Sequence, residues 1–281
     1  MTVAEHGLAS MADGLIEHEP GFYVAGEAGS VSYPDRAHDA CFAVESASWW
    51  FRHRNDCLTA AMRVYPPGGP LLDIGGGNGF VSLALRAAGH ETILLEPGTE
   101  GARNAYARGL RPVIRASFEA SRFRARSLSA AGMFDVLEHI EDDGGFLEGV
   151  VSSLRPEGRL YLTVPAHAAL WSSEDADAGH YRRYDARSLR RTLRASGLEV
   201  EYLTYLYWFL PAPILVLRTL ADRVGLRKGG TAASRRREYV AKGPVLGGAL
   251  RALLAPEVAF ARRGRHVPLG SSLLAVARRP G

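Results

Sequence analysis

The stretch that decides the fold is LLDIGGGNGF, at Leu71–Phe80. An apolar run containing Asp73 leads directly into Gly75, Gly77 and Gly79, and a helix-like segment follows. Glycine lets the backbone turn sharply and approach a ligand closely, and the first turn of the next helix presents free N–H groups. This order predicts a strand, a ligand-binding loop and a helix. A glycine-rich loop alone also fits a tight structural turn.

The next apolar run, ETILLE at 91–96, ends in Glu96. An acid at the carboxyl end of that strand lies at the switch-point crevice, where it can accept hydrogen bonds from both hydroxyls of a ribose. The loop has the spacing G-x-G-x-G, whereas dinucleotide folds that bind a pyrophosphate have G-x-G-x-x-G. The two features together favour a ribose-containing ligand. An NAD-binding domain is the alternative.

Short apolar runs alternate with helical segments along most of the chain, which is typical of a parallel sheet built from βαβ units. The expected strands are 70–74, 91–95, 111–114, 127–134, 159–164, 198–206 and 271–277. The expected helices are 79–88, 101–108, 143–154 and 186–196. The pattern predicts an α/β fold.

The segments outside this alternation suggest the domain organisation. Residues 1–40 are polar and lack periodicity, so we expect them to be loosely ordered. Apolar residues at helical spacing predict a helical cap over 41–66, and prolines and glycines end it. The core then comprises 67–206 and 267–281, and residues 207–266 form an inserted helical lid.

Composition limits the class of protein. With 281 residues, 47% hydrophobic and 23% charged, the chain can fold as one large domain. Two cysteines are too few for a disulfide framework, and the N-terminus lacks the features of a secretory signal, so we expect a cytoplasmic protein. The arginine runs lack interleaved aromatics, which argues against a nucleic-acid partner.

One uncharged run, Leu203–Leu217, needs separate attention. It has 15 residues and two prolines, whereas a bilayer-spanning helix needs about 20 apolar residues. We therefore expect no stable membrane span. The sequence leaves open whether residues 203–220 contact a membrane or a substrate.

The glycine loop and Glu96 resemble the first motif and the ribose-binding acid of class I S-adenosylmethionine-dependent methyltransferases. Three later segments, FDVLEHIEDD at 134–143, VPAHAALW at 164–171 and GHYRRYD at 179–185, are similar to those of a type 11/12-like subfamily found in natural-product or polysaccharide pathways. SASWWFRHRN at 46–55 resembles its N-terminal cap. The resemblance implies a Rossmann-like, seven-stranded, mostly parallel sheet with an antiparallel last strand, helices on both faces, a helical N-terminal cap and an inserted helical lobe before the last strand.

The resemblance also implies S-adenosylmethionine as the cofactor. It assigns to the cofactor site Asp73, Gly75, Gly76, Gly77, Gly79, Glu96, Pro97, Ser117, Phe118, Phe134, Asp135 and Arg54. The family commonly has an acid near Ser117 to hold the adenine amino group, so this chain departs from the pattern, and Phe118 is an alternative contact that stacks on the adenine. An N-terminal arginine neutralises the cofactor carboxylate in related enzymes, and Arg52 and Arg54 are the candidates here.

Titratable residues follow the expected fourth strand. Glu138 and His139, with the later His180, are candidate catalytic groups, and a histidine can act as the general base. With Asp135 they also resemble the E-x-x-E-H divalent-metal cluster of small-RNA and ubiquinone-pathway O-methyltransferases, although Asp135 is one methylene shorter than the usual glutamate. A third interpretation is structural, with Glu138 and His139 capping a helix or tying down the cap.

Aromatic residues fall in the segments expected to border the crevice. The candidate substrate contacts are Trp49, Trp50, Trp171, Tyr181, Tyr184 and Tyr207. They favour a small or medium, partly apolar acceptor such as a natural-product or glycosylated intermediate, with oxygen as the methylated atom. Carbon or nitrogen methylation is an alternative, as is a cyclase or pericyclase that binds the cofactor without transferring its methyl. The sequence is compatible with a monomer or a homodimer.

Overall fold

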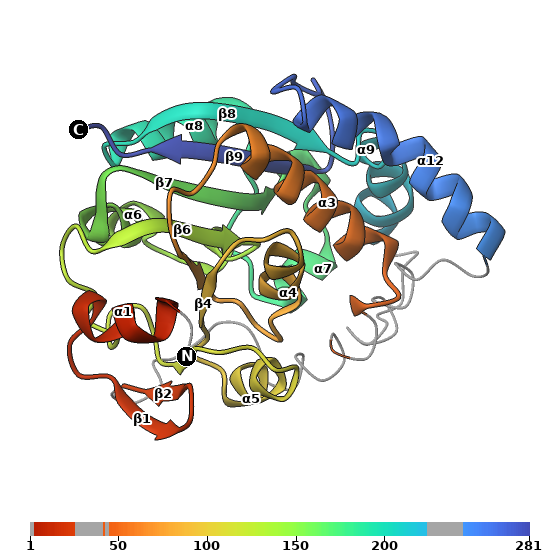
Figure 1. Cartoon of the computed structure of the whole chain (residues 1–281). Coiled ribbons are helices and arrows are strands. Elements are labelled where there is room, and N and C mark those ends of the chain that lie inside the picture. The colour runs from red at the N-terminus through yellow and green to blue at the C-terminus, as the bar shows by residue number, and fades with distance from the viewer. Residues whose placement is uncertain (1–2, 26–41, 43–44, 224–243) are drawn as a thin grey trace.

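The strand before the glycine loop lies at the centre of the sheet. The computed structural model describes residues 3–25, 42, 45–223 and 244–281. In it, β3 (Leu71–Ile74) pairs in parallel with β4 (Thr92–Leu95) and with β6 (Leu128–Phe134). The strand order is β1-β2-β5-β4-β3-β6-β7-β9-β8 (Figure 1). The remaining strands are β1 (Ile16–Glu19), β2 (Phe22–Val24), β5 (Val113–Arg115), β7 (Leu154–Pro165), β8 (Glu199–Leu206) and β9 (Ser272–Arg278).

The directions of the strands confirm the predicted Rossmann-like fold. Strands β2, β5, β4, β3, β6 and β7 run parallel, and β9 is antiparallel to both of its neighbours, β7 and β8. Every residue of β3, β4 and β6 is buried. Central parallel strands are covered on both faces, which is why their sequences read as continuous apolar runs.

In the described residues the sheet has nine strands and not the predicted seven. The two additional strands, β1 and β2, form an antiparallel hairpin that pairs with β5, and helix α1 (Val3–Met11) precedes them. The expectation of loose order is therefore wrong for residues 3–24, whereas residues 26–41 lie outside the described part. The hairpin was missed because its strands have only four and three residues and all four residues of β1 are exposed, so no alternation marks them.

Helices cover both faces of the sheet, as predicted. Core clusters place α1, α6 (Asp143–Ser153) and α8 (Ala186–Ala195) against one face. The other face is covered by α3 (Trp49–Val64), α4 (Phe80–Ala87), α5 (Thr99–Ala107) and α12 (Pro244–Ala261). In Figure 1, α3 crosses in front of the sheet and packs beside α12.

The region predicted as a lid is helical where it is described. It contains α9 (Pro211–Ile214), a π-helical turn (Leu215–Leu220), α10 (Ala221–Arg223) and α12, while residues 224–243 lie outside the described part. Short turns at Leu137–His139 and Ala168–Leu170 and helix α7 (Ser173–Ala178) follow β6 and β7. Within the described ranges, no helix is long and apolar enough to cross a bilayer.

Candidate functional site

The loop after β3 can be formed only with glycine at its turning points. Gly75 and Gly79 have φ angles of 66° and 76°. A Cβ on Gly79 would lie 2.2 Å from Leu110 Cδ1, and one on Gly75 would lie 2.8 Å from Val136 Cγ2. A side chain at either position would clash with its neighbour and strain the backbone. The loop is therefore packed tightly between its neighbours, with the N-terminus of α4 behind it.

Asp73 links the two elements on either side of this loop, β3 and α4. Its buried carboxylate accepts a 2.6 Å hydrogen bond from the hydroxyl of Ser82 on α4. Burial raises the pKa of Asp73 to about 6, although the Ser82 hydrogen bond and the charge of Arg54 oppose that shift. The geometry shows Asp73 joining β3 to α4, and a direct contact with a ligand stays a prediction.

The predicted meeting of the glycine loop and Glu96 is confirmed. Glu96 Oε2 accepts a 2.8 Å hydrogen bond from Gly77 N, and Oε1 accepts a 2.6 Å bond from Gly98 N. The side chain is only 3% exposed. Both N–H donors hold the carboxylate at the ends of β3 and β4, with the half-buried Pro97 beside it. We call Gly75–Gly79, Glu96, Arg54 and Asp135 the central site.

Arg54 reaches the central site from α3. The buried guanidinium pairs with Asp135, which follows β6 directly. Asp135 has a φ of 59°, and Thr163 of β7 fixes it by accepting from its N–H at 2.9 Å and donating to Oδ1 at 2.9 Å. A non-glycine residue in this region is uncommon and occurs where surrounding contacts enforce it.

Arg54 and Arg52 were both candidates for binding a carboxylate. Arg52 is exposed and donates to Ser46 O at 2.7 Å. Arg54 Nε is buried and has no hydrogen-bond partner among the described residues. A buried donor without an acceptor is costly, so this atom suits an anionic ligand group. The donors and acceptors of the central site thus fit a ligand that carries both a carboxylate and ribose hydroxyls.

Ser117, Phe118 and Phe134 already have partners within the protein. Ser117 Oγ accepts from Ala120 N at 3.2 Å. Phe118 packs against Phe123 and Phe146, with ring centroids 5.5 and 5.7 Å away. Phe134 belongs to the core cluster beneath α3 and α4. Contacts of these three residues with a cofactor stay predictions.

The acid and histidine residues after β6 meet as predicted. Glu138, His139 and His180 each place a potential ligand atom within 4.8 Å of the others. The rings of His139 and His180 lie edge to face, 4.7 Å apart. We call these three residues the histidine cluster. Asp135, the fourth predicted metal ligand, is bonded to Arg54 and Thr163 instead.

Burial controls protonation in the histidine cluster. It raises the pKa of Glu138 well above the ordinary value, and the charge of Asp135 adds to the shift. Glu138 Oε2 has no partner among the described residues. Burial, followed by the charge of His180, lowers the pKa of His139 to about 4. Glu138 therefore favours its protonated form and His139 its neutral form.

Asp175 is a member of this site that sequence reasoning missed. Its carboxylate lies 2.9 Å from His180 Nδ1 and accepts from Arg183 Nε at 2.7 Å and Ser172 N at 2.9 Å. Although burial opposes ionisation, the hydrogen bonds from His180 and Arg183 lower the pKa of Asp175. The Ser172-x-x-Asp175 capping box and the histidine five residues later were the available signals.

The candidate substrate aromatics separate into two groups. Tyr181 is 47% exposed, and the side chains of Trp49, Trp50 and Trp171 are half-buried. Tyr184 and Tyr207 lie in the core, and their hydroxyls donate to Asp143 at 2.7 Å and to Trp50 O at 2.8 Å. The expectation that these two tyrosines border an open crevice is wrong, because packing and internal hydrogen bonds hold them inside.

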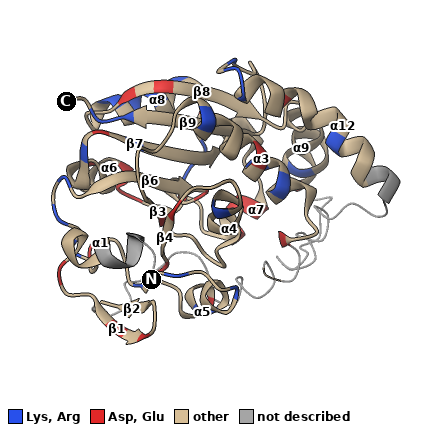
Figure 2. Cartoon of the chain, in the orientation of Figure 1, with Lys and Arg blue, Asp and Glu red and all other residues tan. Residues whose placement is uncertain are grey.

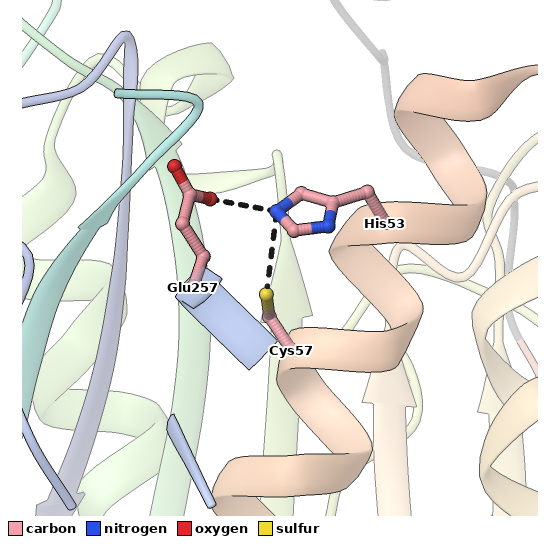
Figure 3. A group of neighbouring side chains, drawn as sticks. All are labelled: His53, Cys57 and Glu257. Carbon is pink, nitrogen blue, oxygen red and sulfur yellow. Dashed lines mark hydrogen bonds and ion pairs between the residues drawn. The ribbon is translucent and has the colours of Figure 1, made fainter. Parts of the chain in front are cut away.

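A second buried cluster joins α3 to α12. His53 Nε2 lies 2.6 Å from Glu257 Oε2 and 3.5 Å from Cys57 Sγ (Figure 3). Glu257 also accepts from Tyr207 N at 2.9 Å and from Trp208 N at 2.7 Å. His, Cys and Glu atoms at these separations can ligate a metal. In this structure, the same residues form four hydrogen-bond and ion-pair contacts that connect α3, α12 and the turn after β8. We call this group of contacts the His53–Glu257 latch.

The sheet order, the glycine loop after the central strand and the acid after its neighbour define the class I methyltransferase fold. The sequence profile described as "Methyltransferase domain" matches residues 50–203, more than half of the chain. The chain therefore belongs to the methyltransferase-domain family.

Individual relatives are distant. The ubiquinone biosynthesis O-methyltransferase of Xanthomonas axonopodis pv. citri is 25% identical over 50% of this chain, and the match spans 66% of that relative's length. A chain of the complex between the Haloferax volcanii Trm112 methyltransferase activator and its methyltransferase partner superposes with a TM-score of 0.56 at 19% identity, covering 88% of this chain and 96% of that chain. A SAM-dependent methyltransferase from Thermotoga maritima gives 0.54 at 16% identity, covering 88% and 100%. The structural likenesses show the fold.

Proposed function

We propose that this protein transfers a methyl group from S-adenosylmethionine to an oxygen atom of a small or medium organic acceptor. The observation that carries the proposal is the buried Glu96 carboxylate, held 2.8 Å from Gly77 N at the ends of two adjacent strands. Residues 67–206 and 267–281 form the cofactor-binding core in this proposal, residues 41–66 the cap and residues 207–266 the lid. The acceptor is a natural-product or glycosylated intermediate.

Glu96 and Arg54 bind opposite ends of the cofactor. The two oxygens of the Glu96 carboxylate lie at the ends of β3 and β4, and a carboxylate there suits the two ribose hydroxyls. Arg54 Nε donates to the carboxylate of the methionine moiety. When bound, the cofactor supplies a methyl group already activated by the sulfonium. The protein then has to align the acceptor and remove a proton.

The geometry favours His180 over His139 as the general base. The ionised Asp175 fixes the His180 ring through Nδ1, which leaves Nε2 to take the proton of an acceptor hydroxyl. His139, with a pKa lowered by burial to about 4, is a weak base, and its ring lies edge to face with that of His180. Burial raises the pKa of Glu138 well above its ordinary value, which favours the protonated form, and that form can donate a hydrogen bond.

A divalent-metal mechanism is the second candidate. Glu138, His139 and His180 are close enough to share one cation, which would acidify a hydroxyl acceptor. Dialysis against a chelator, followed by activity assays with and without added Mg²⁺ or Zn²⁺, separates the two. Full activity after removal of metal would leave the His180 base mechanism.

Cofactor binding can be tested without knowing the acceptor. Calorimetric titration of S-adenosylmethionine into Glu96→Gln should show affinity weakened by roughly 1.5–3 kcal/mol, because charge-assisted hydrogen bonds are lost. Glu91→Gln is the matched control, since Glu91 is exposed and lies directly before β4, the strand that Glu96 follows. Equal affinity in both variants would contradict the assignment of Glu96.

Product analysis tests the reaction. Appearance of S-adenosylhomocysteine during turnover indicates methyl transfer, and its absence while an acceptor is converted would favour the cyclase or pericyclase alternative. Mass and NMR analysis of the product then distinguishes oxygen from carbon or nitrogen methylation.

A further inference from the structure

The helical segment after β8 exposes an apolar stripe. Its inner side is fixed by the buried Ile214 and Thr219 and by Arg218, which donates to Glu174 at 2.5 Å. The opposite side exposes Leu215, Val216, Leu217 and Leu220, and Leu217 is 68% exposed. Helical periodicity places Val216, Leu217 and Leu220 on one face. This face is therefore apolar where a surface helix is ordinarily polar.

Helix α12 repeats this reversed pattern. Leu254, Glu257 and Ala261 are buried, which defines the side that packs on α3. Leu253 and Phe260 are exposed on the other side, as are Ala252, Ala255 and Pro256. Within the described part of α12, the outer face carries arginine as its only charged residue type.

The two apolar faces belong to neighbouring segments. Trp208, at the entry to α9, donates from its backbone N–H to Glu257 at 2.7 Å and from its indole to Leu253 O at 3.4 Å. The indole is itself 45% exposed. We call residues 208–223 and 249–265 together the lid surface. Figure 1 shows α9 and α12 at the same end of the molecule.

The exposed charged residues of the lid surface are all basic. Its exposed basic residues are Arg223, Arg251, Arg262, Arg263 and Arg265. It contains two acids, Asp222, which accepts from Ser173 N at 2.8 Å, and the buried Glu257. Figure 2 shows a basic position on α12, which is Arg251, and three of the other arginines follow the helix. Exposed arginines around an apolar face complement a surface that is both oily and negatively charged.

We propose that the lid surface docks on the surface of an anionic lipid bilayer. The exposed leucines and Phe260 enter the boundary between headgroups and acyl chains, and the arginines bind lipid phosphates. Docking is peripheral, since no helix in the described ranges can span the bilayer. The proposal depends on the lid surface and not on methyl transfer, so it stands or fails separately from the proposed function.

Vesicle co-sedimentation tests the docking directly. The full chain should sediment with vesicles of phosphatidylcholine mixed with phosphatidylglycerol, and much less with phosphatidylcholine alone. Leu217→Ser with Leu220→Ser should reduce binding roughly tenfold, because two apolar side chains no longer enter the lipid. Ile16→Ser is the matched control, since Ile16 is 67% exposed on β1 and outside the lid surface. Its binding should equal that of the wild type.

A second pair of variants tests how much the arginines contribute to vesicle binding. Arg251→Gln with Arg262→Gln should weaken binding to the anionic vesicles several-fold, and added salt should weaken wild-type binding, because anionic lipids attract each arginine electrostatically. Arg190→Gln with Arg191→Gln, on the exposed side of α8, should leave binding unchanged. Absence of wild-type binding to anionic vesicles would overturn the proposal. Equal losses in the lid-surface variants and their controls would overturn it as well.

Discussion

Asp135 combines a positive φ of 59° with an ion pair to a buried arginine. A left-handed residue at the end of β6 turns the chain sharply, so that the carboxylate meets Arg54 on α3 while its amide still pairs with Thr163 of β7. The local strain is offset by these contacts. Asp135 therefore helps to hold the Arg54 guanidinium, whose Nε has no partner among the described residues.

Asp135→Asn should destabilise the protein by about 2 kcal/mol. Asparagine tolerates the left-handed backbone and can still accept the hydrogen bond from Thr163. The lost free energy of unfolding therefore reports the missing negative charge beside the buried Arg54. Urea unfolding measures the change. An unaltered unfolding midpoint would show that Arg54 does not need Asp135 as its counter-charge.

Asp73 should make stability depend on pH. Its folded pKa of about 6 lies above the ordinary 3.8, so the folded state holds the proton more tightly and stability falls as the pH rises between these values. Between pH 5 and 7.5 this contribution should reduce the free energy of unfolding by about 1 kcal/mol. Asp73→Asn should lack that part of the decline in urea unfolding at the two pH values. An identical decline in both proteins would mean that the carboxylate is already ionised at pH 5.

At the scale of elements, the His53–Glu257 latch holds together three pieces that the chain supplies far apart: α3, α12 and the turn after β8 (Figure 3). Tyr207 in that turn stacks on Trp50 with centroids 3.7 Å apart, next to Arg54 along α3. The latch therefore fixes the orientation of the helix that carries Arg54 into the central site.

Glu257→Gln should lower the free energy of unfolding by about 3 kcal/mol, since it removes the buried partner of His53 and one of the acceptors for two backbone amides. Glu157→Gln is the control, because Glu157 forms an exposed pair with Arg278 and should change stability by less than about 0.5 kcal/mol. Chemical denaturation measures both. Similar small losses in the two variants would refute the latch.

How far the elements could be predicted depended on their burial. The continuous apolar runs of β3 and β4 and the spacing from Gly77 to Glu96 were sufficient, because parallel strands must end at the same edge of the sheet. The sequence did not reveal pairs of side chains that only tertiary packing brings together. Two examples are the hydrogen bond from Tyr184 to Asp143 and the contact between His180 and Asp175. Both depend on the path of the chain after β7.

For the whole molecule, the sequence predicted the layers and the edge formed by β8, but not the opposite edge. The seven strands from β3 to β9 and the helices on both faces follow from alternating apolar runs. The hairpin of β1 and β2 extends one edge with short, mostly exposed strands whose order comes from pairing with β5. Edge strands of this length bury too little surface to leave an apolar pattern.

Ligand binding should stabilise the whole molecule. If the central site binds S-adenosylmethionine only when folded, a concentration of about 100 times Kd adds about 2.7 kcal/mol and raises Tm by roughly 4–8 °C. Scanning fluorimetry with S-adenosylmethionine, S-adenosylhomocysteine and NADH measures the shift. The first two ligands should act alike, and Glu96→Gln should lose most of the shift while Glu91→Gln keeps it. A shift with NADH and none with the adenosyl ligands would instead make the central site a dinucleotide site, since Glu96 can accept from the ribose of either class.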